Sequence, residues 1–255
     1  MSECKLCRRE RQLVRAHIIP AAFHRQLQSD TTRPPLVISN NPEVHPKRNP
    51  GGLYDEDLLC GDCEHDRFEP WDAYAAECFI HRIGQDSQRF HPTENLALIF
   101  NSWDQFKLRM FAISLMWRAA VTDKPIFSRV TLGPYEERAR QCILQGEPGP
   151  PEGFSVFLGR WVTRPEYENM GLTQLSPYRT RIDGINILKF FLGGVIIHVK
   201  TDKRQFRDPF SELLLKQDRP VYMVTRELEG SKDILAVRSG IDAYAARLRA
   251  RCTNN

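Results

Sequence analysis

The chain has 255 residues, of which 41% are hydrophobic and 27% are charged, and its formal net charge is +4 at pH 7. These values are typical of a globular protein, and they exclude a collagen, a low-complexity chain and a largely disordered one. No apolar run reaches the roughly 20 residues that a bilayer-spanning helix needs, and the first residues contain no apolar signal-peptide core. We therefore expect a cytoplasmic protein with reduced cysteines and no membrane partner. The mild positive charge permits nucleic acid as a partner without requiring it.

Four of the seven cysteines form two pairs with the same spacing. Cys4 and Cys7 make up one C-x-x-C motif, and Cys60 and Cys63 make up the other. Two such pairs supply the four thiolates of a closed tetrahedral site, so the spacing predicts one structural Zn²⁺. The alternatives are four unrelated thiols or a redox-active C-x-x-C motif, for which a single pair would be enough.

The stretch between the two pairs contains a short apolar segment, a proline-rich loop and a return to order. Residues 15–20 read Arg-Ala-His-Ile-Ile-Pro. Residues 31–52 contain prolines at positions 34, 35, 42, 46 and 50, and they are predicted to be mostly loop. Regular structure is expected again over Leu53–Leu59, directly before the second cysteine pair. Apolar residues then recur at helical spacing, which predicts an amphipathic helix that begins in or near Cys63.

Together these motifs resemble those of a known family. The chain is similar to the zinc-stapled HNH endonucleases in three motifs. These are the two C-x-x-C pairs, a short strand that ends in His-Ile-Ile-Pro, and Leu-Leu-Cys-x-x-Cys at the start of a helix. These enzymes belong to the ββα-metal, or treble-clef, superfamily, and the variant with His-Ile-Ile-Pro is common in bacterial and phage genomes. The resemblance covers residues 1–80 and implies an HNH-like zinc module there.

The resemblance implies a catalytic role for His17. In the family, the histidine of His-Ile-Ile-Pro is the general base, which takes a proton from the water that attacks the phosphodiester phosphorus. A neutral imidazole with an ordinary pKa of about 6.5 suits this task. A catalytic Mg²⁺ or Mn²⁺ would stabilise the charge that develops on the phosphate and on the leaving oxygen. The alternative is a structural histidine that is hydrogen-bonded to the backbone of its strand.

The sequence departs from the family pattern at three positions. The residue before the base is usually an aspartate that binds the catalytic metal, and here it is Ala16, which cannot bind a cation. Where the family has His or Asn after the last cysteine, this chain has Glu64, a hard oxygen ligand suited to Mg²⁺ or Mn²⁺. The family's Asn before the second pair matches Asp57. The alternatives are a helix-start carboxylate for Glu64 and a solvated turn residue for Asp57.

Residues 96–255 carry no catalytic motif, but the chain from residue 81 onward contains clear structural patterns. Residues 81–95 are polar and are predicted to be a linker. Apolar residues at 3-4-3-4 spacing predict a helix over Trp103–Val121, and Pro134 and Gly146 bound a second helix over Tyr135–Leu144. Apolar runs predict five strands and Gly193-Gly194 predicts a tight turn. The strands are Phe154–Val162, Ile185–Phe191, Val195–Val199, Val221–Thr225 and Ile234–Val237, and a closing helix is predicted over Gly240–Arg251.

We therefore expect an α+β protein with an HNH-like zinc module over residues 1–80 and a larger C-terminal α+β domain over 96–255. The expected function is metal-dependent endonucleolytic hydrolysis of DNA phosphodiester bonds, with His17, Glu64 and Asp57 as catalytic residues. By family analogy alone, the setting is phage–host conflict or a mobile element. The rival hypothesis is a non-catalytic zinc adaptor for nucleic acid or protein, which Ala16 favours. DNA is the expected partner, and the sequence also allows a protein partner or a homo-oligomer.

Overall fold

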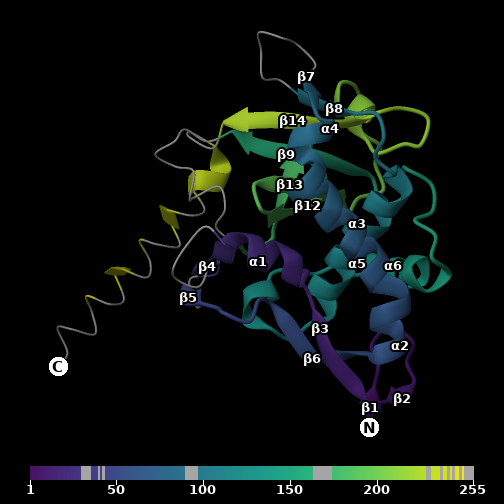
Figure 1. The fold of residues 1–255 in the computed structure, drawn as a ribbon, viewed down its shortest axis with the longest axis vertical. Coiled ribbons are helices and arrows are strands. Elements are labelled where there is room, and N and C mark those ends of the chain that lie inside the picture. Colours follow the sequence, from purple (N-terminus) through teal and green to yellow (C-terminus); the bar gives the residue numbers. More distant parts are fainter. Residues whose placement is uncertain are drawn as a thin grey trace.

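The computed structural model describes residues 1–29, 36–39, 41, 44–89, 97–162, 174–227, 231–235 and a few isolated positions beyond them. It has the predicted mixed α+β composition, with one seven-stranded mixed sheet, three smaller sheets and a central group of helices (Figure 1). In the part of the chain so described, no helix is both long and apolar enough to cross a lipid bilayer.

The N-terminal part is built on an antiparallel pair of strands. Its strands are β1 (Ser2–Glu3), β2 (Glu10–Arg11), β3 (Leu13–His17) and β6 (Tyr54–Cys60). Strand β3 pairs with β6, so that His17 stands opposite Tyr54, and a bulge after Val14 shifts the register. Strands β1 and β2 pair with each other around the first cysteine motif. The predicted short strand that ends in His17 is confirmed.

A continuous helical stretch follows the second cysteine pair. It consists of α2 (Gly61–Cys63), η1 (Glu64–Phe68), α3 (Glu69–Ala76), η2 (Glu77–Arg82) and α4 (Ile83–Asp86). The helix predicted to begin in or near Cys63 therefore begins at Gly61. Pro70 lies in the first turn of α3, and the π-helical turn η1 precedes it. A wider turn at this place accommodates a residue that has no backbone N–H to donate.

The segment between β3 and β6 contains more regular structure than its prolines suggested. It holds α1 (Ala21–Ser29), β4 (Leu36–Ile38) and β5 (Lys47–Arg48). The sequence did not predict α1, because only Phe23 and Leu27 among its residues are large, apolar and buried. Strand β4 pairs with β5 and also with β10 (Gln174–Leu175), a partner far along the chain.

Two helices of the C-terminal part were predicted closely. Helix α5 (Gln105–Val121) begins after Asp104, whose carboxylate accepts a hydrogen bond from the backbone N–H of Lys107 at 3.1 Å. Helix α6 (Tyr135–Gln145) ends at Gly146, which adopts a left-handed φ of 69°. Helix α5 packs against α3, α6 and the sheet, and most of its residues are buried on every face. It is therefore the central helix of the molecule and carries more than one buried stripe.

The large sheet contains four of the five predicted strands. Its order is β11-β12-β13-β9-β14-β8-β7, and only β9 and β14 pair in parallel. The strands are β7 (Gln88–Arg89), β8 (Ala97–Phe100), β9 (Val156–Val162), β11 (Tyr178–Ile182), β12 (Ile185–Leu192), β13 (Val195–Lys200) and β14 (Val221–Glu227). Gly193 and Gly194 form the predicted tight turn, with φ values of 55° and 85°.

Two predictions for this part were wrong. Residues 81–89 are not a linker, because they complete the helical stretch and form β7 at the edge of the large sheet. Ile234 and Leu235 are helical and do not form the fifth strand. Their apolar run was too short to separate a strand from a buried helical turn by its pattern. The predicted closing helix over 240–251 lies almost entirely outside the described residues.

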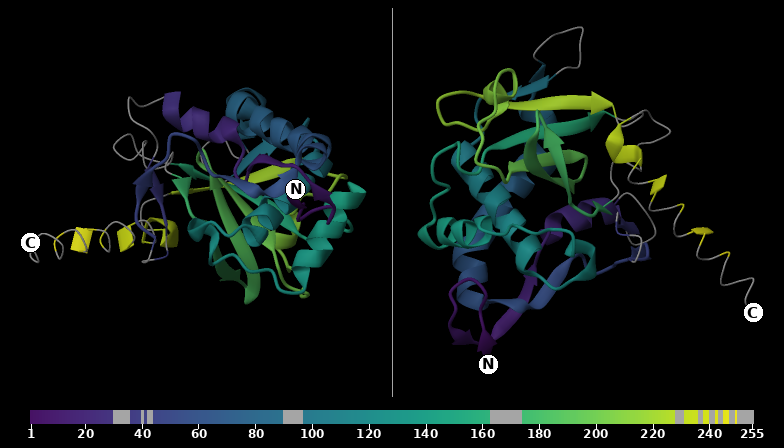
Figure 2. Two further views of the ribbon diagram at one scale, coloured as in Figure 1. Left: turned by 90° about the horizontal axis from the view of Figure 1, so that it is seen from below. Right: turned by 180° about the vertical axis from the view of Figure 1, so that it is seen from behind.

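One hydrophobic cluster extends through both predicted units. It joins Cys4 and Phe68 of the N-terminal part to Trp117, Phe154 and Met223 of the C-terminal part. In two views, α3 and α5 lie between the large sheet and the β3–β6 pair (Figure 1, Figure 2). The division at residues 80 and 96 stays a prediction, and the shared core means that mutations on either side of it act on a common packing unit.

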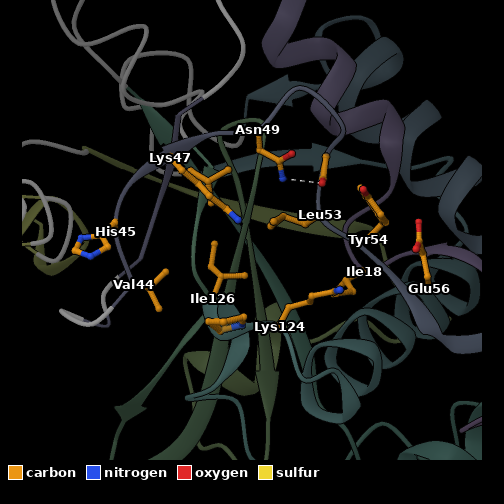
Figure 3. Close-up of a pocket in the computed structure, with 13 residues that line it drawn as sticks. Ile18, Val44, His45, Lys47, Asn49, Leu53, Tyr54, Glu56, Lys124 and Ile126 are labelled. Carbon is orange, nitrogen blue, oxygen red and sulfur yellow. Dashed lines mark hydrogen bonds between the residues drawn. The ribbon is translucent and has the colours of Figure 1, made fainter.

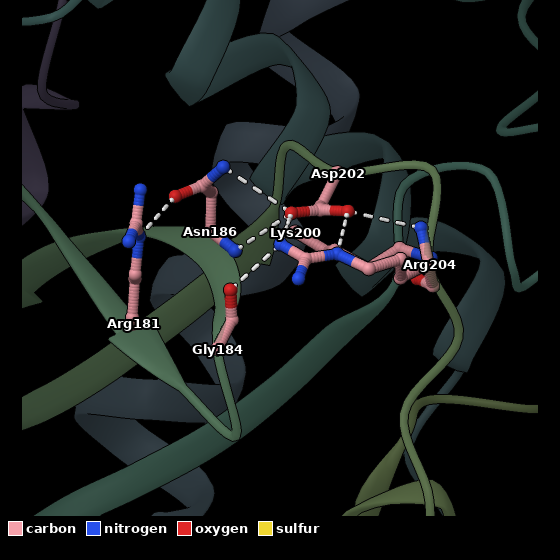
Figure 4. Close-up of polar contacts among 6 residues, drawn as sticks. All are labelled: Arg181, Gly184, Asn186, Lys200, Asp202 and Arg204. Atoms are coloured by element: carbon pink, nitrogen blue, oxygen red, sulfur yellow. Dashed lines mark hydrogen bonds and ion pairs between the residues drawn. The ribbon is translucent and has the colours of Figure 1, made fainter.

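A polar cluster stabilises the open end of the β12–β13 hairpin (Figure 4). The carboxylate of Asp202 accepts hydrogen bonds from the Arg204 guanidinium at 2.6 and 2.9 Å and from the Asn186 backbone at 3.1 Å. These bonds, those from Arg204 above all, hold the pKa of Asp202 well below its ordinary range. Lys200 is buried and donates to the backbone carbonyl of Arg204 at 2.8 Å. All the partners are internal, so this cluster is structural.

Candidate functional site

The four predicted cysteines come together in one cluster. Cys4 and Cys7 lie on the turn between β1 and β2, Cys60 ends β6, and Cys63 ends α2. Their sulfur atoms all lie within 4.8 Å of one another. The turn that carries the first pair closes through a hydrogen bond from the Arg8 N–H to the Cys4 carbonyl at 2.8 Å, and Arg8 adopts a left-handed φ of 59°.

The electrostatics of the cluster fit a bound metal ion. The Cys63 thiol donates a hydrogen bond to Cys4, which lowers the pKa of Cys4 to about 4, and the same bond raises the pKa of Cys63. Zn²⁺ would bind the deprotonated sulfur atoms and neutralise the thiolates in a tetrahedral site. The four cysteines thus form a cluster compatible with a structural Zn²⁺.

His17 ends strand β3, four residues along the strand from Leu13, which pairs with Cys60. Its ring meets the ring of Tyr54 edge-on, with centroids 6.1 Å apart. Burial lowers the pKa of His17, and the positive charges of Arg15, Arg118 and Arg25 lower it further. The imidazole is therefore held in its neutral form, which is the form that can accept a proton.

Glu64 lies beside His17. It is the first residue after Cys63, and its carboxylate receives a hydrogen bond from the backbone N–H of His17. Burial raises the pKa of Glu64, and the positive charge of Arg118 opposes this shift. The Oε2 atom is buried and has no hydrogen-bond partner among the described residues. A buried carboxylate oxygen without a partner is costly, and a bound cation would compensate it.

Arg118 of α5 connects this site to the centre of the molecule, and sequence reasoning missed it. Its side chain is fully buried and donates to both carboxylate oxygens of Asp72, each at 2.7 Å. The same guanidinium donates to the backbone carbonyl of His17 at 2.7 Å. The signal in the sequence was an arginine inside the apolar pattern of α5, which also contains Arg109. Arg118 therefore fixes the end of β3 against α3 and α5.

Asp57 lies apart from His17 and Glu64. Tyr54 is the strand partner of His17, and Asp57 follows Tyr54 by three residues along β6. At the usual rise of a strand, this separates Asp57 from Tyr54 by about 10 Å. The side chain of Asp57 is exposed and lines a hollow with Met1 and Arg11. The structure thus brings Glu64 to His17 but does not bring Asp57 to them.

Ala16 faces the core instead of the site. It is fully buried and stands opposite Asp55 in the β3–β6 pair. The buried Asp55 carboxylate accepts a hydrogen bond from the Thr122 hydroxyl, and Lys124 lies 3.8 Å from it. An aspartate at position 16 would place a second carboxylate against Asp55, so this substitution would not restore the family's metal ligand. The sequence did not single out Asp55, which is buried in an otherwise acidic and exposed part of β6.

An open pocket of about 530 Å³ lies next to the same pair of strands (Figure 3). Tyr54 belongs to its wall, and the centroid of its ring lies 6.1 Å from that of His17. Of the basic residues near the site, Arg15 lies over the ring of Tyr54 at 3.6 Å, whereas Arg8 forms an ion pair with Glu137 at 2.6 Å. Arg15 therefore places positive charge at the ring of Tyr54.

Comparison of the chain with protein-family models, with curated proteins and with solved structures gave no match. The class that the fold and the site define is a mixed α+β protein with a four-cysteine cluster able to hold a metal ion.

Proposed function

We propose that the chain is a zinc-stapled HNH-type endonuclease, which hydrolyses DNA phosphodiester bonds with the help of Mg²⁺ or Mn²⁺. The observation that supports this most is the position of the Glu64 carboxylate beside His17, next to the four-cysteine cluster. A neutral histidine and a hard oxygen ligand are the two groups that the reaction requires. Strands β3 and β6 and the helix after Cys63 supply the ββα arrangement on which such sites are built.

In the proposed reaction, His17 accepts a proton from the attacking water. Arg118 donates a hydrogen bond to the backbone carbonyl of His17, and the Glu64 carboxylate accepts one from its backbone N–H. These two bonds fix the backbone that carries the imidazole. Glu64 offers its free Oε2 to the divalent cation, which when bound would stabilise charge on the phosphate oxygens. Mg²⁺ keeps several water ligands, so a single carboxylate is compatible with its binding.

The test of this proposal is nicking of plasmid DNA by the zinc-loaded protein with Mg²⁺ or Mn²⁺. Replacing His17 by alanine should lower the rate by about 10²–10⁴-fold, because the reaction loses its general base. Glu64→Gln should raise the concentration of cation needed, since the amide is a weaker ligand. His65→Ala is the matched control: His65 is exposed and lies next to Glu64 in the chain, and its loss should leave the rate unchanged.

The second candidate function is a non-catalytic zinc adaptor. It is favoured by Ala16, which faces the core, and by Asp72, whose carboxylate is already engaged by Arg118. Wild-type protein that binds DNA or protein but nicks no DNA with either cation would establish the adaptor and refute the endonuclease.

The lowered pKa of His17 predicts the acid limb of the pH profile. A general base works in its neutral form, and burial together with Arg15, Arg118, Arg25 and His24 keeps His17 neutral below pH 6.5. The nicking rate should therefore persist at pH 6.5, where an ordinary histidine is half protonated, and fall only as the pH drops through the lowered pKa. A rate profile at a fixed cation concentration measures this. An acid limb centred above pH 6.5 would contradict the assignment of His17 as the base.

A further inference from the structure

The pocket beside Tyr54 is formed by three segments that are far apart in the sequence. The end of the β3–β6 pair supplies Tyr54 and the adjoining residues Ile18 and Leu53. The turn after α5 supplies Lys124 and Ile126, and the segment around β5 supplies Val44, Lys47 and Asn49. Its volume of about 530 Å³ falls within the range of pockets that hold a small organic ligand. The wall is fixed, because Asn49 donates to the Gly52 carbonyl at 2.7 Å and accepts from the Gly51 N–H at 3.2 Å.

The lining of this pocket combines an apolar floor with two lysines and one carboxylate, that of Glu56. Ile18, Leu53 and Ile126 supply the apolar surface, and the side chains of Lys47 and Lys124 enter from two different walls (Figure 3). Lys47 is exposed and forms no ion pair with any residue in the described part of the chain. Lys124 lies near Asp55, whose carboxylate already accepts the Thr122 hydroxyl. A ligand with a flat apolar part and an anionic part would satisfy both features.

We propose that this pocket binds one unstacked nucleotide of a DNA strand, with its base on the apolar floor and its phosphate at Lys47 and Lys124. The inference rests on the proposed endonuclease function and names the form of its substrate. Tyr54 lines the pocket with its ring 6.1 Å from the ring of His17, and Ile18, the residue after His17, lines it too, so a nucleotide bound there would be close to a phosphodiester at His17. A base inside a duplex is stacked on both faces and cannot enter a pocket. The protein should therefore prefer single-stranded, frayed or flapped DNA over intact duplex.

The experiment measures binding separately from cleavage. The full-length, zinc-loaded His17→Ala protein is titrated into short labelled oligonucleotides, single-stranded or duplex, and the fluorescence anisotropy is recorded at several salt concentrations. Lys47→Glu should weaken binding of the single strand about tenfold and lower the slope of log Kd against log salt by about 1, because one phosphate contact is lost. Lys203→Glu, the same charge change at an exposed residue outside the pocket, should weaken it much less.

A second variant tests whether the pocket binds the nucleobase. Ile126→Trp fills the floor of the pocket without changing the charge, and it should abolish the preference for single-stranded over duplex DNA. In wild-type background, a 2-aminopurine placed in a single strand should change its fluorescence on binding, and Ile126→Trp should remove this change. Lys47 is exposed, so Lys47→Glu stays informative even if the tryptophan variant does not fold.

The outcomes separate this proposal from the endonuclease proposal. Equal effects of Lys47→Glu and Lys203→Glu, or tighter binding of duplex than of single strand, would overturn the nucleotide pocket even if the protein nicks DNA. Pocket-dependent binding of the single strand by a protein that nicks no DNA would uphold the pocket and refute the nuclease. Pocket variants that weaken both binding and nicking would support both proposals.

Discussion

Replacement of Cys60 by serine should remove the bound zinc and unfold the N-terminal part of the chain. The four sulfur atoms lie within 4.8 Å of one another and bring together the β1–β2 turn, the end of β6 and the start of the helical stretch. Zinc binding to comparable cysteine sites contributes on the order of 10 kcal/mol of apparent free energy, which in such sites is also folding free energy. Metal analysis should give about one zinc per wild-type chain and almost none for Cys60→Ser.

The matched control is Cys142→Ser, because Cys142 is a free, half-buried cysteine outside the cluster. This variant should keep its zinc and its melting temperature to within a few degrees. A strong chelator should reproduce the effect of Cys60→Ser on the wild-type protein. Because the hydrophobic core is shared, the loss of zinc should also lower the melting temperature of the C-terminal part. A Cys60→Ser protein that retains one zinc per chain would contradict the four-sulfur site.

The features that the sequence predicted are those with a local signature. The spacing of the two C-x-x-C pairs identified the four cysteines, although the pairs are far apart in the chain. The 3-4 spacing of apolar residues and the positions of Pro134 and Gly146 defined α5 and α6, because helix periodicity and capping depend on neighbouring residues. Gly193 and Gly194 defined the tight turn for the same reason, since both need positive φ.

The features that the sequence did not predict depend on contacts between distant segments. Asp57 matched a family position in the alignment of motifs, but the bulge after Val14 and the register of β6 place it away from His17. The pocket beside Tyr54 needs three separate segments, and no local pattern marks it. Arg118 looked like an interruption of an apolar helix, because its partners His17 and Asp72 lie on other elements. A charged residue within a buried helical pattern is therefore a useful sign of a long-range polar contact.

Replacement of Arg118 by methionine should destabilise the protein by about 3–5 kcal/mol, because it leaves the Asp72 carboxylate nearly buried without its partner. The methionine fills much of the same volume, so the loss reports mainly on the charge and on the hydrogen bond to the His17 carbonyl. Denaturant unfolding monitored by circular dichroism measures the change. Lys107→Met on the same helix is the control: Lys107 is exposed, and its loss should cost less than about 0.5 kcal/mol.

The double variant Arg118→Met with Asp72→Leu distinguishes a buried ion pair from general packing. Removing one partner leaves an uncompensated charge, whereas removing both leaves the carbonyl of His17 without its donor and Glu64 without a nearby positive charge. The double variant should therefore be more stable than Arg118→Met alone, by about 1–3 kcal/mol. If the two losses simply add, Arg118 and Asp72 act independently and the ion pair does not hold β3 in place. Recovery of stability in the double variant without recovery of DNA nicking would show that the contact to His17 serves the site in addition to the fold.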